Sequence, residues 1–389
     1  MKKYIFTIIV SLMLIGTMPG KIFAEEAENT ISLAEEAKSA ILLEQSTGKI
    51  LFEKNAHEKL PPASLTKVMT LLLVMEELDK GTLTLDEIVR VSERAASMGG
   101  SQVFLAPGEE ISVEDLLKSI AIASGNDASV AIAERISGSE EAFVKRMNEK
   151  AKELGLKNTT FKNSSGLPAK DHFSSAYDLA IMSKELLKYE SITNYTSIYE
   201  DYLRKGQDNE FWLVNTNKLV RFYDGVDGIK TGYTREAKYG LAATAKKADM
   251  RIIAVVMGAD TVKKRNSMVS QMLDYSFNHF DTHRLFEKQE IVTKIDVLQS
   301  EEEEIKVITE TPISVLHKKG EALDDIHTEI NMQESLTLPI EKGEQIGSLI
   351  VRRGKDEISV HPLTVERDIH KASYLNLVKR SFKKMLKIK

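Results

Sequence analysis

Ser64 and Lys67 are the two residues whose types and spacing most directly suggest catalysis. They lie three positions apart in the segment PPASLTK, residues 61–67. If a helix begins near Ser64, both side chains lie on one face of it, a single turn apart. A serine hydroxyl becomes a nucleophile when a neighbouring base takes its proton, and a lysine amine can be that base. The pair therefore makes covalent catalysis by serine a hypothesis, although Ser-x-x-Lys alone is a weak pattern and leaves a non-catalytic interpretation open.

The element that would position this pair is the apolar run 68–78. The run is apolar nearly all round, which is typical of a helix buried in the middle of a domain. Two prolines precede it and Gly81 follows it, as expected at the two ends of a helix. It is too short, and too closely flanked by charge, to span a membrane. The Ser-x-x-Lys pattern also occurs at Ser46 and Ser381, but only Ser64 has this helical context.

A second polar group, Ser124 and Asn126, stands where one helical pattern breaks and another begins. A capping box at residues 112–115 opens the first helix, which we expect to run to Ala123, and the second is expected over residues 128–136. Side chains at this break could face a cleft. Serine, glycine and asparagine are also favoured in a simple helix–helix turn, so these residues by themselves leave both interpretations open.

The third group is Lys230-Thr231-Gly232, a Lys-Thr-Gly sequence that occurs once in the chain. A strand carrying Lys230 and Thr231 at its edge would offer a cation and a hydroxyl, which suit a terminal carboxylate. Gly232 would allow an extended peptide to approach the backbone closely. A glycine-rich hairpin is the alternative interpretation of this stretch.

Composition limits the class of protein. The 389 residues suffice for two domains, and 42% hydrophobic with 29% charged residues is typical of a soluble globular protein. The net charge of -5 is mild and gives no indication of nucleic-acid binding. The chain has no cysteine, which excludes disulfides and thiolate nucleophiles. His279 and His283 have the spacing of a zinc-binding helix, but Phe280 stands where a metalloprotease carries its glutamate, so no metal or cofactor is predicted.

The N-terminus has the pattern of a secretory signal peptide. Lys2 and Lys3 give it a positive start, residues 4–18 are apolar, and cleavage is expected after Ala24. An uncleaved anchor is the alternative, although the apolar stretch is short and acidic residues follow it. An exported chain without cysteine indicates a bacterial envelope protein.

In residues 25–283, strands are expected near both ends and helices between them, which predicts an α/β (α+β) domain. Its first hairpin, residues 40–52, is expected to pair with two late strands in one antiparallel sheet. From about residue 285 the pattern changes to short alternating stretches separated by turns, which predict a small all-β domain. The predicted domains are residues 1–24 (signal peptide), 25–283 (mixed domain), 284–363 (β-rich domain) and 364–389 (tail helix).

Individual elements are predicted within these limits. Further helices are expected over residues 86–98, 140–154, 175–189 and 261–280, and the two late strands over 239–245 and 251–257. Strands of the β-rich domain are expected over residues 291–297, 305–308, 313–316, 336–339 and 349–352.

The last segment, residues 373–389, is predicted to be an amphipathic helix. Its apolar residues fall on one half of a helical projection and its lysines and arginine on the other, with no acidic residue. Such a helix lies in the membrane interface with its cations toward anionic headgroups. A helix packed on the β-rich domain is the alternative. The first interpretation predicts a protein held on the outer face of the cytoplasmic membrane.

Taken in order, Ser-x-x-Lys, Ser-x-Asn and Lys-Thr-Gly are far more specific than any of the three alone, and together they are known from penicillin-binding proteins and class A β-lactamases. With the stretches 166–180 and 225–234, the chain resembles the low-molecular-mass penicillin-binding proteins that are serine-type D-alanyl-D-alanine carboxypeptidases. The resemblance covers about residues 34–363, and the β-rich region looks like the family's C-terminal domain. Many relatives have Ala-Gly-Tyr near residues 237–240, where this chain has Ala-Lys-Tyr-Gly, a difference that removes no catalytic group.

The resemblance implies a penicillin-binding-protein/β-lactamase-like fold and hydrolysis of a peptidoglycan stem peptide that ends in D-Ala-D-Ala. Ser64 would attack the carbonyl between the two D-alanines, the terminal D-Ala would leave, and water would release the acyl-enzyme. β-Lactam antibiotics would acylate the same serine as covalent inhibitors. The pKa of Lys67 must fall by ~2–3 units from ~10.4 for this amine to act as a base near neutrality, and burial and a second cation, Lys230, both act in that direction.

The family further implies a role for each site residue. Ser124 would pass a proton to the leaving amine, and Asn126 would hold the substrate amide and the lysine. The backbone N–H groups of Ser64 and Tyr233 would bind the oxyanion. The remaining substrate-binding residues are Lys230, Thr231 and Gly232, with Arg265 assisting at the terminal carboxylate.

Four other functions would share parts of this site. A β-lactamase needs a base for deacylation. The segment 190–194 resembles only loosely the segment that carries this base in class A β-lactamases, and it lies too far beyond Ser124 in the sequence. A transpeptidase or endopeptidase on the same fold would share the acylation step. A non-enzymatic envelope binding protein would be expected to have lost a motif residue, and none is lost.

Overall fold

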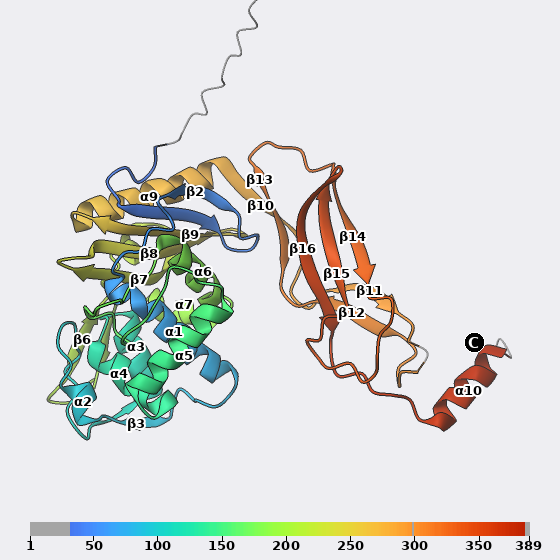
Figure 1. Cartoon of the computed structure of the whole chain (residues 1–389), viewed down its shortest axis with the longest axis horizontal. Coiled ribbons are helices and arrows are strands. Elements are labelled where there is room, and N and C mark those ends of the chain that lie inside the picture. Colours follow the sequence, from blue (N-terminus) through green and yellow to red (C-terminus); the bar gives the residue numbers. More distant parts are fainter. Residues whose placement is uncertain (1–31, 298, 386–389) are drawn as a thin grey trace, which may run out of the picture. The chain divides into compact units, whose positions relative to one another are not determined.

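The structure is a computed structural model that describes residues 32–297 and 299–385; the predicted signal peptide lies outside the described residues. A five-stranded antiparallel sheet has helices on both faces (Figure 1). The strand order is β2-β1-β9-β8-β7, so the first hairpin pairs with the late strands and β2 and β7 are the edges. The predicted fold class is confirmed. The five strands are β1 (Ser39–Glu44), β2 (Ile50–Lys54), β7 (Val226–Thr234), β8 (Lys238–Lys247) and β9 (Met250–Ala259).

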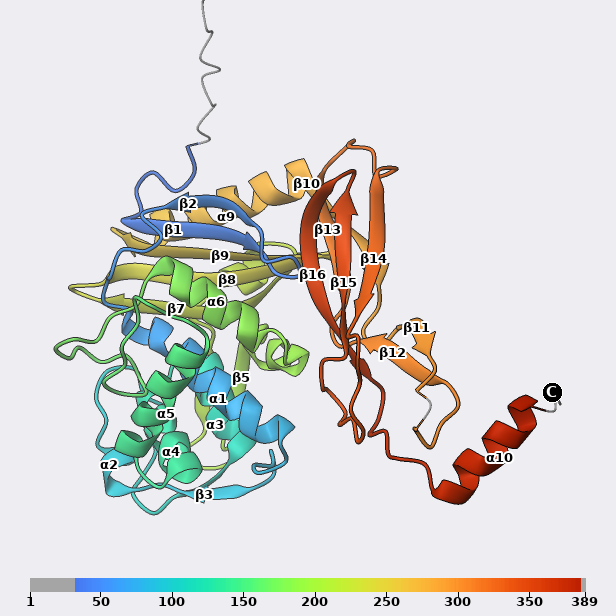
Figure 2. The same cartoon turned by 45° about the vertical axis from the view of Figure 1, so that its right-hand side comes forward.

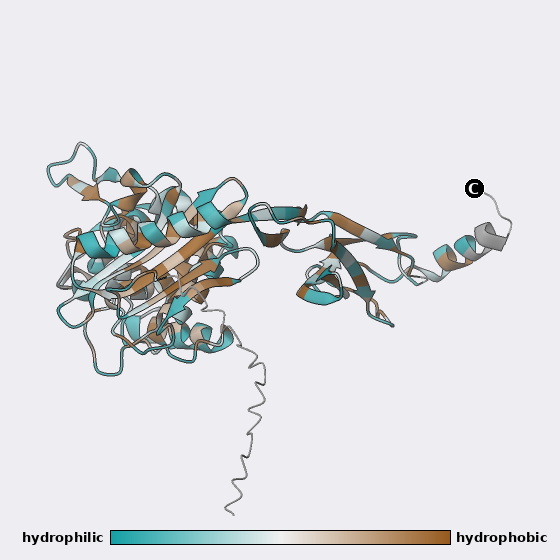
Figure 3. Cartoon of the chain, turned by 90° about the horizontal axis from the view of Figure 1, so that it is seen from above, coloured by the Kyte–Doolittle hydropathy of each residue, from teal (hydrophilic) through white to brown (hydrophobic). Residues whose placement is uncertain are grey.

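The sheet separates two apolar cores because side chains alternate along its strands. In β1, Ile41 and Leu43 belong to one core and Ala40 and Leu42 to the other, and all four are buried. Helix α9 (Val262–His279) covers the second core, and α1 (Lys67–Asp79) and α6 (Ala176–Leu186) pack on the first. Figure 3 shows hydrophobic residues concentrated in the strands of this sheet.

Helix α1 (Lys67–Asp79) is the centre of the helical side. Its residues from Lys67 to Glu76 are all buried, which confirms the helix predicted from the apolar run. No side chain caps its N-terminus. Fully burying a leucine, valine or methionine contributes about 1.5–3 kcal/mol, so packing on every side stabilises α1 without a cap. This rigid, buried element is what carries Lys67.

Most other helices begin where the sequence places a capping residue. Ser112 accepts a hydrogen bond from the Asp115 N–H at the start of α3, and Ser175 accepts one from the Asp178 N–H at the start of α6. These helices follow the predicted segments. Their bounds are α3 (Val113–Ala121), α4 (Asn126–Ser137), α5 (Glu140–Glu153) and α6 (Ala176–Leu186); the shorter helices are α7 (Thr193–Thr196), α8 (Leu219–Phe222) and the 3-10 turns η1 (Ala63–Thr66) and η2 (Glu190–Ile192).

The helix predicted over residues 86–98 is wrong. The segment instead forms strand β3 (Ile88–Arg90), which pairs with β4 (Glu110–Ser112), followed by the short helix α2 (Glu93–Ala96). Val89 is buried between exposed neighbours, which is the period of a strand, and Ser92 caps a new helix after it. A second small hairpin joins β5 (Glu200–Leu203) to β6 (Phe211–Val214).

The predicted all-β domain is present (Figure 2). Its sheet has the order β11-β12-β16-β15-β14, and β10 pairs with β13. The strand predicted over residues 336–339 is wrong, because Pro339 cannot donate a ladder hydrogen bond and only Ile340 forms a bridge, to Ile369. The strands are β10 (Phe280–Phe286), β11 (Ile291–Ile295), β12 (Ile305–Thr309), β13 (Ile313–Lys318), β14 (Ile326–Met332), β15 (Gly347–Arg353) and β16 (Asp356–Val365).

The tail contains helix α10 (Tyr374–Met385), within the predicted segment. Tyr374 and Leu375 are among its exposed residues. Of the helices in residues 32–297 and 299–385, none is long and apolar enough to cross a membrane.

Candidate active site

Ser64 lies in the 3-10 turn η1, immediately before α1 begins at Lys67. Lys67 Nζ is 3.2 Å from Ser64 Oγ, so the predicted juxtaposition of the two side chains is present. Ser64 is half-buried, whereas Lys67 is completely buried. The hydroxyl is thus reachable from outside while the amine beneath it is shielded from water.

Two glycines let neighbouring backbone press against this turn. A Cβ on Gly232 would lie 2.8 Å from the Pro62 carbonyl oxygen and 3.1 Å from the Leu65 amide nitrogen. A Cβ on Gly166, whose φ is +86°, would overlap the carbonyl of Ala63. Only glycine allows both approaches. Strand β7 and the loop at residue 166 therefore meet the serine turn from two sides.

Lys67 has three hydrogen-bond partners. Besides Ser64, its amine donates to Asn126 Oδ1 at 2.6 Å and to the carbonyl oxygen of Ser165 at 2.7 Å. Burial lowers the pKa of Lys67 well below its ordinary value, the nearby cation Lys230 lowers it further, and Asp127 opposes the change. The site therefore favours the neutral amine, which is the form of a base.

Asn126 is held in one orientation. Its Nδ2 donates to the carbonyl of Gly99 at 2.7 Å, which leaves Oδ1 to face Lys67. Its backbone N–H donates to the carbonyl of Ser101 at 2.7 Å. Asn126 is also the first residue of α4, so the break between helices places it in the site.

Ser124 occupies the same break with a left-handed backbone, φ +65°. The side chain is 3% exposed, and its Oγ has no hydrogen-bond partner among the described residues. A left-handed non-glycine residue and an unpaired buried hydroxyl each cost on the order of 1–3 kcal/mol. A turn that served only to connect two helices would not need either feature.

Lys230 and Thr231 lie on the edge strand β7 and are buried. Lys230 Nζ donates to the Thr231 carbonyl at 3.3 Å, and Thr231 Oγ1 donates to Thr216 Oγ1 at 2.8 Å. Burial and, after it, the charge of Arg265 lower the pKa of Lys230 to about 7. The predicted cation and hydroxyl are therefore adjacent, and the cation is close enough to act on Lys67.

Arg265 and Tyr233 lie at the margin of this cluster. Arg265 comes from α9, is buried, and donates to Asn266 Oδ1 at 2.8 Å; burial lowers its pKa to about 10. Tyr233 is 52% exposed and stacks on Tyr239, with ring centroids 4.3 Å apart. Arg265 reaches Lys230 through its charge rather than through a hydrogen bond between the two side chains.

The loop that supplies the Ser165 carbonyl was not predicted as part of the site. Asn163 Oδ1 accepts hydrogen bonds from the backbone N–H groups of Ser165, Gly166 and Leu167, which closes the loop on itself. Thr70 Oγ1, one turn beyond Lys67 on α1, donates to the carbonyl of Ser164 at 2.6 Å. An asparagine before Ser-Ser-Gly is a turn signal that could have indicated this loop, but not that its carbonyl would face Lys67.

The side chain of His172 contacts the η1 turn at Thr66. Its Nδ1 accepts from the Lys162 N–H at 3.1 Å, so Nε2 carries the proton and donates to Thr66 Oγ1 at 2.8 Å. Burial lowers the pKa of His172 to about 4, which keeps the ring neutral. The other two histidines of interest do not share a helix, because α9 ends at His279 and His283 is in β10.

Comparison with known proteins identifies the family. Residues 24–261 match the Peptidase_S11 family, described as D-alanyl-D-alanine carboxypeptidase. The chain belongs to this family. Residues 280–371 match the C-terminal domain of penicillin-binding protein 5. The resemblance to low-molecular-mass penicillin-binding proteins is thus confirmed, and the chain is a serine-type peptidase of the D-alanyl-D-alanine carboxypeptidase family.

Individual relatives match over most of the chain. D-alanyl-D-alanine carboxypeptidase DacF of Bacillus subtilis is 53% identical over 389 residues, 100% of both chains. DacC of Escherichia coli is 34% identical over 90% of this chain and 89% of its own. The crystal structure of penicillin-binding protein 5 from Haemophilus influenzae is similar, with a TM-score of 0.69, 30% identity, and coverage of 87% of this chain and 98% of that one.

Proposed function

We propose that this carboxypeptidase removes the terminal D-Ala from peptidoglycan stem peptides through an acyl-enzyme on Ser64. The observation that carries the proposal is the set of three partners around Lys67. A neutral amine has two N–H bonds and one lone pair. Asn126 Oδ1 and the Ser165 carbonyl are pure acceptors and take the two N–H bonds, which leaves the lone pair for the Ser64 hydroxyl. Lys67 would then remove the Ser64 proton during attack.

The terminal carboxylate of the substrate would bind at Lys230 and Thr231. An ammonium and a hydroxyl side by side suit a carboxylate, and burial makes their interaction with it stronger than in water. Arg265 would add positive potential without direct contact, since its hydrogen bonds are with Asn266. The carboxylate requirement explains why a carboxypeptidase rather than a general peptidase is proposed.

The tetrahedral intermediate would be stabilised by the backbone N–H groups of Ser64 and Tyr233. Proton delivery to the departing D-Ala amine is assigned to Ser124, whose buried hydroxyl is free to bond substrate. Asn126 would bind the substrate amide as well as Lys67. Water would then attack the acyl-enzyme and release the shortened peptide, which completes hydrolysis.

β-Lactams would acylate Ser64 by the same attack. The structure of a penicillin-binding protein from Listeria monocytogenes, which has a TM-score of 0.57 and 32% identity over 64% of this chain and 98% of that one, is described in a cefotaxime-bound form. Transpeptidation is the second candidate activity. It is favoured by a Streptomyces protein described as a DD-transpeptidase, which is 26% identical over 62% of this chain. Transpeptidation and hydrolysis share the acylation step and differ in whether an amine or water then accepts the acyl group.

We also propose an exported enzyme whose tail rests on the outer face of the cytoplasmic membrane. Tyr374 is 80% and Leu375 72% exposed on α10, and apolar side chains at such exposure are suited to a lipid interface. Arg380 donates to the Ser300 carbonyl at 2.7 Å, the kind of contact expected if α10 instead packs on the β-rich domain. The proposed divisions remain residues 1–24, 25–283, 284–363 and 364–389.

The test is mass spectrometry of the purified mature protein with a D-Ala-D-Ala peptide and with penicillin. Wild type should release D-Ala and gain the mass of one penicillin. Ser64→Ala should lose both, while Ser46→Ala, which alters the Ser-x-x-Lys pattern outside the helix, should retain both. A penicillin adduct on the Ser64→Ala protein would exclude Ser64 as the nucleophile.

A further inference from the structure

Two cations, Lys218 and Arg221, are held over one aromatic ring. The amine of Lys218 is 5.0 Å from the centre of the Tyr199 ring, and the guanidinium carbon of Arg221 is 4.8 Å from the same centre. Lys218 is half-buried and Arg221 is exposed. Among residues 32–297 and 299–385, neither side chain has an ion pair or a hydrogen bond. Nothing in the proposed mechanism uses these two charges.

The ring between the two cations is fixed in place. The carbonyl oxygen of Tyr199 accepts a hydrogen bond of 2.7 Å from the Asn215 N–H, at the base of the β5–β6 hairpin. Phe222 meets the Tyr199 ring edge-on, with ring centroids 6.3 Å apart, and its own centroid is 5.8 Å from the Arg221 guanidinium. A cation within about 6 Å of a ring centre is attracted to the ring. Tyr199 thus keeps two like charges near each other, and an anion that approaches them is attracted by both.

Two hydrogen bonds join this segment to β7 beside the proposed carboxylate site. Thr216 Oγ1 accepts from Thr231 Oγ1 at 2.8 Å, and Asn217 Nδ2 donates to the Gly228 carbonyl at 3.0 Å. Lys218 follows directly, so its Cα lies within about 7 Å of the Thr216 Cα. The two cations are therefore near the position proposed for the terminal carboxylate of the substrate.

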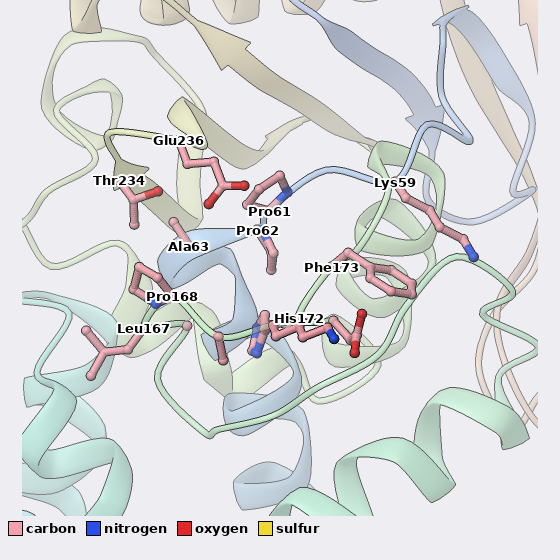
Figure 4. Close-up of a pocket in the computed structure, with 14 residues that line it drawn as sticks. Lys59, Pro61, Pro62, Ala63, Leu167, Pro168, His172, Phe173, Thr234 and Glu236 are labelled. Atoms are coloured by element: carbon pink, nitrogen blue, oxygen red, sulfur yellow. The ribbon is translucent and has the colours of Figure 1, made fainter.

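The cations belong to one end of β7 only. Thr234, at the other end, lines a cavity beside the Ser64 turn (Figure 4), and none of the residues 216–222 lines that cavity. Gly232, two residues after Lys230, is the residue of β7 that contacts the turn. A peptide with its carboxylate at Lys230 and its scissile carbonyl at the serine therefore extends toward Thr234, and its charged C-terminus is the part nearest the cations.

We propose that Lys218 and Arg221 form an anion-steering patch, which attracts the free carboxylate at the C-terminus of the substrate before this group reaches Lys230 and Thr231. Unpaired surface charges of this kind raise the rate of encounter with an oppositely charged ligand, and dissolved salt screens their effect. The inference rests on the proposed function, because it takes Lys230 and Thr231 as the carboxylate site.

Reversal of the two charges gives an effect of opposite sign. For a separation on the order of 12 Å in water, two unit charges change the encounter with a singly charged peptide roughly threefold at low salt, and reversing both changes it about tenfold. The double variant Lys218→Glu/Arg221→Glu should therefore have a kcat/KM about tenfold lower than wild type at about 0.01 M salt. As salt is raised to about 1 M, kcat/KM should fall in wild type and rise in the variant.

The substrates are a diacetylated lysyl-D-Ala-D-Ala peptide, which carries only its terminal carboxylate, and the same peptide amidated at its C-terminus. The amidated peptide is uncharged, so its slower reaction should depend little on salt and should differ little between the proteins. The double variant Lys152→Glu/Lys157→Glu makes the same change of charge at two exposed positions and should keep the salt dependence of wild type. The effect should lie in KM rather than in kcat, because the patch acts before the peptide is bound.

Three results would contradict steering while D-Ala release continues. They are a salt dependence in Lys218→Glu/Arg221→Glu equal to that of wild type, a loss that salt does not change, and an equal loss for the acid and amidated peptides. The last two would show that the substitutions act on folding or on the chemical step. Failure of wild type to release D-Ala from the acid peptide would instead overturn the proposed function, and steering with it.

Discussion

Lys67 Nζ lies 2.6 Å from Asn126 Oδ1, closer than its 3.2 Å distance to Ser64 Oγ. The amide of Asn126 is fixed in turn by the Gly99 carbonyl. A neutral acceptor at this position orients the amine without favouring its charged form as strongly as a carboxylate would. The identity of residue 126 therefore sets whether Lys67 can be a base.

Asn126→Asp should convert this relationship into an ion pair. A carboxylate against the amine should raise the pKa of Lys67 by about 1–3 units, which lowers the rate of penicillin acylation about tenfold to a thousandfold at a pH below the new pKa. Part of the loss should be recovered at high pH. Asn209→Asp, the same change at an exposed turn, is the control and should have no effect. A pH-independent loss in Asn126→Asp would show that Asn126 acts on substrate or on the fold, not on Lys67.

The three motifs could be predicted because they depend on side-chain type. Helix α1 could be predicted because apolar residues on every side of a short run leave few alternatives to a buried helix. The role of the Ser165 carbonyl could not be predicted, because every residue has a carbonyl. The direction of this one depends on how Asn163 closes the loop. The position of Gly232 was predicted for the approach of a peptide, but the structure adds a second reason, its contact with the Pro62–Leu65 turn.

The elements that were predicted wrongly are those whose sequence combines strand and helix patterns or lacks a clear apolar period. Residues 86–98 contain both a three-residue strand and a capped helix of four residues, and a single helical period cannot represent both. Strand β14 was missed because most of its residues are exposed, so no apolar alternation marks it. Pairing with β15 across the sheet, which only the folded chain reveals, stabilises β14.

Lys230→Met should weaken the reaction through the substrate carboxylate. Loss of a hydrogen bond to a charged group costs about 1.5–3 kcal/mol, which is roughly a tenfold to 150-fold fall in kcat/KM. The same peptide amidated at its C-terminus should already react poorly with wild type and should lose less with the variant than the acid peptide, because only the effect of Lys230 on the pKa of Lys67 is then removed. Lys152→Met, at an exposed position of α5, should change neither rate. Equal losses for the acid and amide peptides would mean that Lys230 acts only through the pKa of Lys67 or through folding, and not on the substrate carboxylate.

The pH dependence follows from two lowered pKa values. Binding requires charged Lys230, whose pKa is lowered to about 7 in the free enzyme, and attack requires neutral Lys67, whose pKa is lowered well below its ordinary value. As pH rises through about 7, Lys230 loses its charge and kcat/KM for the acid peptide should fall; at low pH, Lys67 gains a proton and the rate should fall again. The expected profile is a bell.

The fall in rate on the high-pH side of the profile gives the more specific test of the role of Lys230. Bound carboxylate favours the charged form of Lys230, so this limb should lie at higher pH in kcat than in kcat/KM. The amidated peptide has no carboxylate, and its profile should lack the limb. A kcat/KM for the acid peptide that rises steadily to pH 9 would contradict the assignment of Lys230.

The tail should bind the enzyme to anionic vesicles. Removing residues after Ala372 leaves β16 and the Ile340–Ile369 bridge intact, and the shortened enzyme should be fully active but unbound. Each cation contributes on the order of 1 kcal/mol near an anionic surface, and the apolar half adds to this. High salt should therefore weaken vesicle binding of the full-length mature protein without abolishing it.

Substitutions at two neighbouring positions of α10 distinguish membrane binding by insertion of apolar side chains from binding by charge attraction. Leu375→Gln removes an exposed apolar side chain whose burial in lipid contributes about 1.5–3 kcal/mol, so vesicle affinity should fall roughly tenfold to a hundredfold. Asn376→Gln, its neighbour outside the predicted apolar half, should leave affinity unchanged. If both variants and wild type sediment equally with anionic vesicles, charge alone holds the protein there. If the wild type ignores such vesicles at low salt, α10 packs on the β-rich domain, as the Arg380 contact with Ser300 would then indicate.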